Sequence, residues 1–315
     1  MNLSLAPAAT LAVARRRPRF AGLVWGELFK LVRLRIVWVL VALETLFILG
    51  ALVLLAMSPD TKSALSDNAL GAFHNLLQGD LSLARIFTGI AVLILAAHVV
   101  GLEYQQGTIR ILLGRGVGRL QLLGAKVLAL AVITLALLAA ELALEAIVAW
   151  MLVSALDGSA WRALNAEFWA DARFYLLGVL VSIGATLLLG VVASVVGRSL
   201  SFGLAVALSW FPVDNLVTIP LNLAVRLTHS DFWSTVSTCL LGPLLNRLSG
   251  YLAPAWHLTV SGPSGPTVAT MHDDGFGIQP LAPVTAAHAL AVIGVYGLVF
   301  AVTAVVLTWR RDVLE

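Results

Sequence analysis

Six apolar segments, each about the length of a membrane-crossing helix, constrain the fold of this chain more than any other feature. They cover residues 36–57, 84–102, 127–152, 174–196, 202–224 and 286–308. A helix needs ~20 mostly apolar residues to cross the hydrocarbon core of a bilayer. Hydrophobic residues make up 60% of the chain and charged residues 12%, whereas about 25% of a soluble domain is charged. The sequence therefore predicts an all-α membrane protein with six transmembrane helices.

The fifth segment is the weakest of the six, because Pro212, Asp214 and Pro220 interrupt its outer half. Irregular backbone at membrane depth is tolerated only where protein or water covers it. We therefore expect a kinked or partly unwound end, capped by Asp214 and Asn215. After it, residues 225–285 form a long external segment, with short external or re-entrant helices first and a Gly/Pro-rich loop second.

The distribution of lysine and arginine predicts the orientation of the chain. If the N-terminus is inside, residues 1–35, 103–126, 197–201 and 309–315 are cytosolic and hold 14 of the 20 basic residues. Cytosolic loops carry such an excess in most membrane proteins. We therefore expect a cytosolic N-terminal segment, a transmembrane domain over residues 36–308 and a short cytosolic tail.

The N-terminal segment contains a second helical pattern. Residues 15–35, RRRPRFAGLVWGELFKLVRLR, combine basic side chains with apolar ones at helical spacing. This favours an amphipathic helix that lies in the inner headgroup layer and turns into the first span. An ordinary basic flank would explain the charges but not the apolar spacing, and both interpretations stay open.

A polar stretch, EYQQGTIRILLGRGVGRLQLLGAK, separates the second and third spans at residues 103–126. One helical face gathers Tyr104, Thr108, Ile109, Leu112 and Leu113. Glycines at 114, 116 and 118 then break the helix. We expect a helix over residues 104–113 that lies across the cytosolic mouth of the protein, followed by a flexible corner. Such an arrangement is typical of a docking element.

This stretch resembles the signature of ABC type-2 permeases, the membrane subunits of a large class of ABC exporters. That signature has an acid, a Gly-Thr pair, a basic residue and apolar positions, then a turn, an arginine and a lysine at the foot of the third span. The matching residues are Glu103, Gly107, Thr108, Arg110, Arg119 and Lys126. The tail WRRDVLE and the segment GELFKLVRLR also resemble the family. Gly116 departs from it, because proline is common there, and this predicts a looser corner.

The resemblance implies a coupling helix that docks on a separate ATP-hydrolysing subunit. The residues expected at that contact are Glu103, Gly107, Thr108, Arg110 and Arg119. Glu103 is expected to cap the helix, because an acid is favourable near a helix N-terminus, and Gly107 would let the partner approach closely. The two arginines would pair with the partner or with lipid phosphates. The chain has no G-x-x-x-x-G-K-[ST] phosphate loop, so we expect no cofactor in it, with ATP and Mg²⁺ bound by the partner.

The resemblance also implies the assembly and its location. Six spans are half of the usual twelve-span exporter, so a second copy of the chain or a sister permease is expected beside it in the bilayer. We expect a multi-pass protein of the cell membrane, in a bacterial or archaeal inner membrane. The net charge of +3 gives no reason to expect nucleic acid as a partner. The transported substrate is not encoded in any motif.

Three acids lie within the predicted spans: Glu44, Glu141 and Glu145. Ionisable residues there are rare and usually face the bundle interior, and Glu141 and Glu145 share one helix face. They form either the polar wall of a translocation path or hydrogen bonds that fix helix packing. For Glu44 the packing interpretation is favoured.

Two other classes of function compete with the exporter permease. An ion- or proton-coupled carrier would use the three intramembrane glutamates, but the chain shows no inverted repeat and a carrier needs no ordered cytosolic helix. An intramembrane enzyme would use the glutamates with His98. However, ELALE has no histidine at metal-ligand spacing, and His98 is expected near the opposite membrane face. We therefore expect a transport subunit and not an enzyme.

Overall fold

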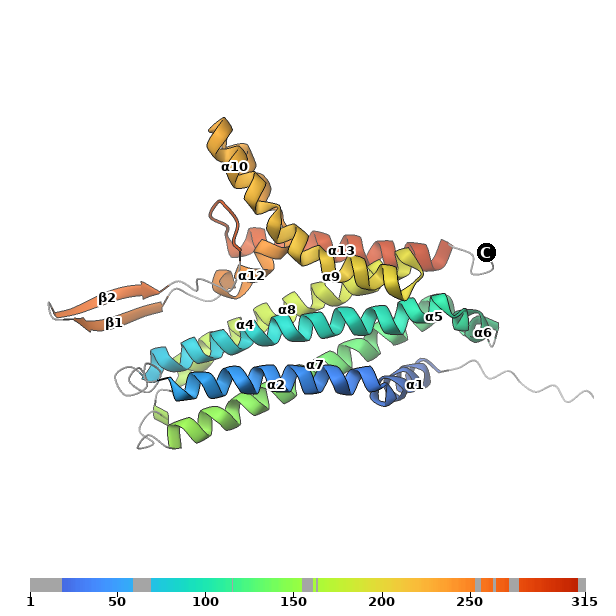
Figure 1. Ribbon diagram of the computed structural model, residues 1–315, viewed down its shortest axis with the longest axis horizontal. Coiled ribbons are helices and arrows are strands. Elements are labelled where there is room, and N and C mark those ends of the chain that lie inside the picture. Colours follow the sequence, from blue (N-terminus) through green and yellow to red (C-terminus); the bar gives the residue numbers. More distant parts are fainter. Residues whose placement is uncertain are drawn as a thin grey trace, which may run out of the picture.

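The computed structural model describes residues 19–58, 69–114, 116–154, 161–162, 164–252, 256–262, 265–271 and 278–310. In these ranges the chain is a bundle of long helices with shorter ones at its ends and one β-hairpin (Figure 1). The long helices are α2 (Arg35–Met57), α4 (Ala69–Ala96), α7 (Arg119–Ser154), α8 (Ala166–Gly197), α9 (Leu200–Leu216) and α13 (Ala286–Arg310). The short ones are α1 (Phe20–Arg33), the π-helix η1 (Ala97–Gly101), α5 (Leu102–Gln105), α6 (Thr108–Gly114), α10 (Thr218–Thr228), α11 (Asp231–Ser237) and α12 (Leu241–Leu252).

Five helices are long and apolar enough to cross a membrane, and a bent pair makes a possible sixth. The five are Leu81–Gln105, Arg119–Met151, Phe168–Gly197, Leu200–Thr228 and Ala286–Arg310. The bent pair is α1 with the first part of α2, which meet at 64°. Each of the six predicted segments lies within one of these helices or within α2, except that the third, 127–152, ends one residue beyond Met151. The bend also separates α1 from the first span, as an interfacial helix would require.

Helix α8 lies at the centre of the bundle and is its most buried span. Its packing against α4 and α9 depends on small residues. A Cβ atom added at Gly190 would lie 2.9 Å from the Cβ of Ala96, and one at Gly203 would lie 2.8 Å from the Oγ of Ser194. Small residues allow helix backbones to approach closely in membranes, where helices gain little from hydrophobic burial. These glycines therefore fix α4, α8 and α9 against one another.

The π-helix η1 connects the end of α4 to α5. A Cβ atom at Gly101 would lie 2.8 Å from the carbonyl oxygen of Ser199, so glycine permits the contact with the turn between α8 and α9. A few residues on, the side-chain oxygen of Gln105 accepts a hydrogen bond of 3.2 Å from the backbone N–H of Leu200. Single π-turns within helices often mark functional sites. Here the turn positions α5 and α6.

The helix predicted over residues 104–113 begins later, which corrects the expected boundary. Gly107 has φ +68 and separates α5 from α6, which starts at Thr108. Glycine adopts the left-handed region at no steric cost, so the Gly-Thr pair encodes a break within the stretch. Gly116 has φ +83, a value that proline, fixed near −65°, does not adopt. The glycine that departs from the family signature therefore gives the corner a different backbone path.

The fifth span differs from its prediction, because it stays helical instead of unwinding. Pro212 lies inside α9, and α10 follows directly, so that the pair leaves the bundle at an angle (Figure 1). Asp214 does not cap this span. Its carboxylate accepts a hydrogen bond from the backbone N–H of Gly242, and it thereby caps the first turn of α12. The side-chain oxygen of Asn215 accepts a hydrogen bond of 3.0 Å from the side-chain nitrogen of Asn246, which also lies on α12.

The segment that follows the fifth span contains α11, α12 and a β-hairpin. Strands β1 (Trp256–Gly262) and β2 (Gly265–Met271) are antiparallel, with Val260 opposite Thr267. The fold is thus not entirely helical, and the loop predicted for this region is wrong over both strands. Apolar and polar residues alternate in both strands, as is typical of a β-strand. The glycines and prolines nearby nevertheless led to the prediction of a loop.

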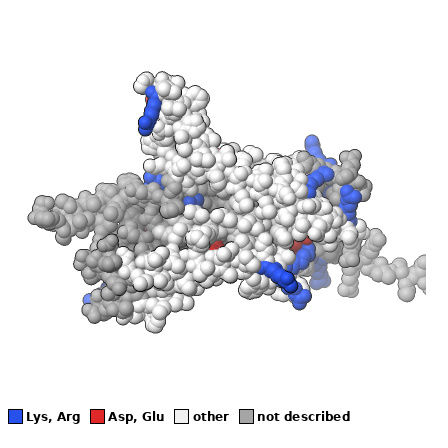
Figure 2. All heavy atoms as spheres, viewed as in Figure 1, with Lys and Arg blue, Asp and Glu red and all other residues white. Residues whose placement is uncertain are grey.

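Basic residues gather at one end of the bundle. Figure 2 shows described lysines and arginines at the end that carries α1, α6 and the last turn of α13, whereas the middle of the bundle on this face is almost free of charge. The exposed side chains of Trp38 and Trp309 lie at this end, and those of Trp150 and Trp169 at the other. This is the arrangement that the predicted orientation requires, and the orientation itself stays a prediction.

Candidate functional site

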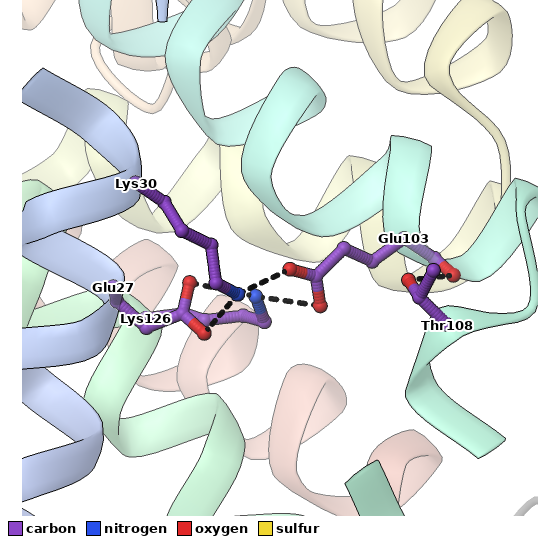
Figure 3. A network of polar contacts seen from close by, with 5 residues as sticks. All are labelled: Glu27, Lys30, Glu103, Thr108 and Lys126. Atoms are coloured by element: carbon purple, nitrogen blue, oxygen red, sulfur yellow. Dashed lines mark hydrogen bonds and ion pairs between the residues drawn. The ribbon is translucent and has the colours of Figure 1, made fainter. Parts of the chain in front are cut away.

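Four charged side chains meet at the basic end of the bundle: Glu27, Lys30, Glu103 and Lys126 (Figure 3). We call them the inner charge network, because the predicted orientation would place this end on the cytosolic side. Lys30 Nζ lies 2.7 Å from Glu27 Oε1 and 2.9 Å from Glu103 Oε1. Lys126 Nζ lies 3.0 Å from Glu27 Oε2 and 2.8 Å from Glu103 Oε2. Each carboxylate therefore joins both ammonium groups, and the formal charges cancel.

The network joins three segments that are distant in sequence. Glu27 and Lys30 lie one turn apart on α1, Glu103 lies on α5 directly after the π-helix, and Lys126 lies on α7. The side chains of Lys126 and Glu27 are 3% and 5% exposed, whereas that of Lys30 is 49% exposed. Buried charges are tolerated only when their partners are well placed. The network therefore fixes α1, α5 and α7 relative to one another.

Lys30 closes the network on the solvent side. Partial burial lowers the pKa of Lys30, but its hydrogen bonds and its attraction to Glu27 and Glu103 outweigh this and raise the pKa above the ordinary value. Lys30 therefore carries its charge throughout the physiological range.

Glu103 serves this network and does not cap a helix, which corrects the prediction for its side chain. The backbone carbonyl of Glu103 makes the local contact instead: it accepts a hydrogen bond of 3.3 Å from the hydroxyl of Thr108. Thr108 thus ties the first turn of α6 to α5 across the break at Gly107. Glu103 and Thr108, both predicted to contact the ATPase subunit, therefore lie together, and the hydrogen bond between them uses the backbone of Glu103.

The two arginines of the signature have different surroundings. Arg119 donates to the carbonyl oxygen of Trp309 at 3.3 Å, so it binds the last turn of α13, where a cation is favourable. Arg110 is exposed on α6, next to Ile111, which is 60% exposed. Of the two, Arg110 is therefore the arginine that a partner can reach most directly.

An open groove of about 400 Å³ lies between α1 and the α5–α6 segment. We call it the inner groove. Its walls include Glu27, Lys30, His98, Glu103, Thr108 and Ile111. The inner charge network forms one side, and α6 forms the other. The groove therefore combines charged and apolar surface at the basic end of the molecule.

The intramembrane acids Glu44 and Glu141 meet on one hydroxyl group. The Oγ1 of Thr88 on α4 lies 2.7 Å from Glu44 Oε1 on α2, and 3.2 and 3.0 Å from the two carboxyl oxygens of Glu141 on α7. All three side chains are buried. Glu145 is half-buried one turn further along α7. A hydroxyl donates only one hydrogen, so Thr88 can donate to one of the two carboxyl groups at a time.

Comparison with known proteins places the chain in a family. A model of the ABC-2 family transporter proteins matches residues 23–222, which is more than half of the chain. The chain belongs to the ABC-2 transporter family. The search of curated proteins found no match.

The matched region of this ABC-2 protein extends from α1 to α10. It includes the inner charge network, the inner groove and the Glu44–Thr88–Glu141 contact. Membership agrees with a multi-pass membrane protein and supports a non-catalytic membrane subunit over an intramembrane enzyme. The β-hairpin and α13 lie outside the match.

Sequence reasoning missed three residues of these sites. Glu27 and Lys30 were seen only as part of a segment that resembles the family, although an acid three residues before a lysine on an apolar helix is a visible signal. Thr88 gave no signal, because a single threonine in an apolar span is common. Its importance comes from two glutamates on other helices.

Proposed function

We propose that this ABC-2 protein is the membrane-spanning permease subunit of an ATP-driven exporter. In this proposal α5, α6 and the inner groove dock on a separate ATP-binding-cassette subunit, which binds ATP and Mg²⁺. Both termini lie in the cytosol, and the chain spans the cell membrane beside a second copy of itself or a sister permease. The translocation path lies between the two permease chains.

The position of α6 carries the proposal. Helix α6 lies beyond the end of the apolar bundle (Figure 1) and among its basic residues (Figure 2). It presents Arg110 and the exposed Ile111, and the contact between Thr108 and Glu103 connects it to the inner charge network. Arginine is among the residues enriched where single side chains contribute most to protein interfaces. An element that is both exposed and fixed to three helices is suited to transmit force from a partner.

Copurification with the ATP-binding-cassette subunit tests the docking surface. We expect Arg110→Glu and Ile111→Asp each to reduce recovery of that subunit by about tenfold or more, which corresponds to the loss of one well-placed contact. Arg226→Glu is the matched control, because it reverses a charge that is also exposed, on α10, at a distance from α6. ATP hydrolysis in lipid nanodiscs should decrease in parallel. Full recovery of the subunit with both α6 variants would show that this surface does not dock.

The Glu44–Thr88–Glu141 contact supports one other candidate, a proton-coupled carrier. A carrier would move its substrate in proteoliposomes that contain this chain alone, under an imposed proton gradient. An ATP-driven permease would require the second subunit and ATP. Transport without that subunit, abolished by Glu141→Gln, would favour the carrier over the permease.

A further inference from the structure

A small pocket lies between α6, α7 and α13, next to the inner charge network, and we call it the α6 pocket. Its walls include Ile109 and Leu113 of α6, Leu122 and Lys126 of α7, and Thr308 of α13. Its volume is about 20 Å³, and a cavity needs about 10–15 Å³ to hold one water molecule. The pocket therefore has room for a single water but not for a larger ligand.

The hydroxyl of Thr308 has no hydrogen-bond partner among the described residues, although Thr308 is only 8% exposed. Two other buried threonines donate to the carbonyl four residues before them, Thr134 to Leu130 at 2.7 Å and Thr186 to Ser182 at 2.9 Å. Nearly all buried polar groups in proteins are hydrogen-bonded. The hydroxyl of Thr308 therefore requires a partner that its own helix does not supply, and it lines the α6 pocket.

Lys126 brings a second polar group to the wall of this pocket. An ammonium group has three N–H donors, and among the described residues that of Lys126 contacts two carboxylates, Glu27 and Glu103. At least one N–H is left for a further acceptor. Because the side chain is 3% exposed, bulk solvent cannot supply that acceptor. Lys126 and Thr308 thus line the same water-sized pocket, each with an unused hydrogen-bonding group.

We propose that the α6 pocket binds one ordered water, which accepts a hydrogen bond from the ammonium group of Lys126 and donates one to the hydroxyl oxygen of Thr308. Buried waters make two to four such bonds. Water fits because it both accepts and donates, whereas a metal ion of similar size would be repelled by the positive charge of Lys126. The site is independent of the docking proposed for α6.

The water extends the inner charge network to the sixth span. Arg119 of α7 already binds the last turn of α13 through the carbonyl oxygen of Trp309, at 3.3 Å. The water adds a second link between the two helices at the neighbouring residue, Thr308. This residue lies outside residues 23–222, which the family model matches. A segment beyond the match is thereby joined to the charge network within it.

Thr308→Val tests the water through the sign of its effect on stability. Valine has nearly the shape of threonine but lacks the hydroxyl. If the hydroxyl binds the water, Thr308→Val should raise the equilibrium constant of unfolding by about fivefold, which corresponds to one lost hydrogen bond. If the hydroxyl were buried without a partner, removing it would be neutral or stabilising. Thr308→Ser keeps the hydroxyl and should restore most of the loss. Reversible unfolding by SDS in mixed micelles measures these constants.

Two further variants separate the water from an ordinary packing role of Thr308. Thr134→Val is the matched control, because its buried hydroxyl bonds within its own helix and the Leu130 carbonyl keeps its helical N–H partner. It should change the unfolding constant by less than about twofold. In a Lys126→Met background the water loses its donor, so Thr308→Val should also have an effect of less than about twofold.

A structure of the full chain, at a resolution that shows ordered waters, tests the site directly. We expect one water within hydrogen-bond distance of Thr308 Oγ1 and Lys126 Nζ in the wild type, and none in Thr308→Val. Three results would each overturn the proposal: no water in the wild-type pocket, a Thr308→Val protein at least as stable as the wild type, or an equal effect of Thr308→Val with and without Lys126.

Discussion

Replacing Lys126 by methionine perturbs the inner charge network at its most buried point. The ammonium group of Lys126 contacts Glu27 at 3.0 Å and Glu103 at 2.8 Å, and its side chain is 3% exposed. Lys126→Met preserves the length and apolar contacts of the side chain but removes one positive charge. Glu27, which is also buried, then keeps only its contact with Lys30 within the network.

The expected loss is large because water cannot replace the missing charge. Removing one partner of a buried ion pair costs about 3–5 kcal/mol, and we expect Lys126→Met to fall in that range. Lys30→Met breaks two contacts of similar length, 2.7 and 2.9 Å, but Lys30 is half-exposed. Exposed ion pairs contribute about 0.2–1 kcal/mol. The two variants have the same chemistry and nearly the same geometry, so burial alone separates them.

A double variant isolates the role of charge. Glu103→Gln combined with Lys126→Met removes one acid and one base, which leaves the neutral pair of Glu27 and Lys30. The double variant should therefore lose less than the sum of the two single losses. Reversible unfolding by SDS in mixed micelles measures all of these changes. The reasoning would be refuted if Lys30→Met lowered the free energy of unfolding as much as Lys126→Met does. It would also be refuted if the loss in the double variant equalled the sum of the losses in Glu103→Gln and Lys126→Met.

Three further predictions follow from the topology, the intramembrane contact and the corner. In a Cys239→Ser background, single cysteines in 58–83, 153–173 and 225–285 should react with an impermeant reagent from outside the cell, whereas those in 103–126 should not; reaction in 103–126 would reverse the orientation. Thr88→Val should destabilise the protein by about 1–3 kcal/mol, because it leaves buried carboxyl groups without a donor, and Thr88→Ser should restore most of the loss; equal unfolding of all three proteins would show that the contact is unimportant. Gly116→Pro should impair folding or α6 docking because its φ of +83 is closed to proline, whereas Gly116→Asn should be tolerated better; wild-type yield and ATPase recovery with Gly116→Pro would contradict this.

The spans could be predicted from the sequence because the requirement for ~20 apolar residues acts on each segment separately. The same holds for the break at the α6 corner, where three glycines lie within five residues. Apolar spacing did not predict the break at Gly107. The spacing around this residue is helical, but its positive φ divides the stretch into two helices. The β-hairpin was missed for a related reason, because Gly and Pro near the strands outweighed the alternation within them.

The partners of charged residues could not be predicted, because they depend on contacts between distant segments. Glu103 looked like a helix cap from its neighbours, yet its carboxylate lies against Lys30, 73 residues before it. Asp214 looked like a cap of its own span and instead caps α12, 28 residues on. Periodicity shows which face of a helix a residue occupies. It does not show which helix lies opposite.

The inner charge network limits how the α5–α6 segment can move if a partner pulls on α6. Thr108 ties α6 to α5, and Glu103 ties α5 to both α1 and α7. A shift of α6 must therefore move these helices together or break buried ion pairs, and breaking them costs several kcal/mol. Two glycines with positive φ, Gly107 and Gly116, bound α6 and can absorb changes in its angle at little cost. Tilting of α6 is therefore easy, whereas translation of α6 is coupled to α1 and to α7, the helix that carries Glu141. A pull transmitted along α7 would reach the buried contact between Glu141 and Thr88 before it reached the far end of that helix.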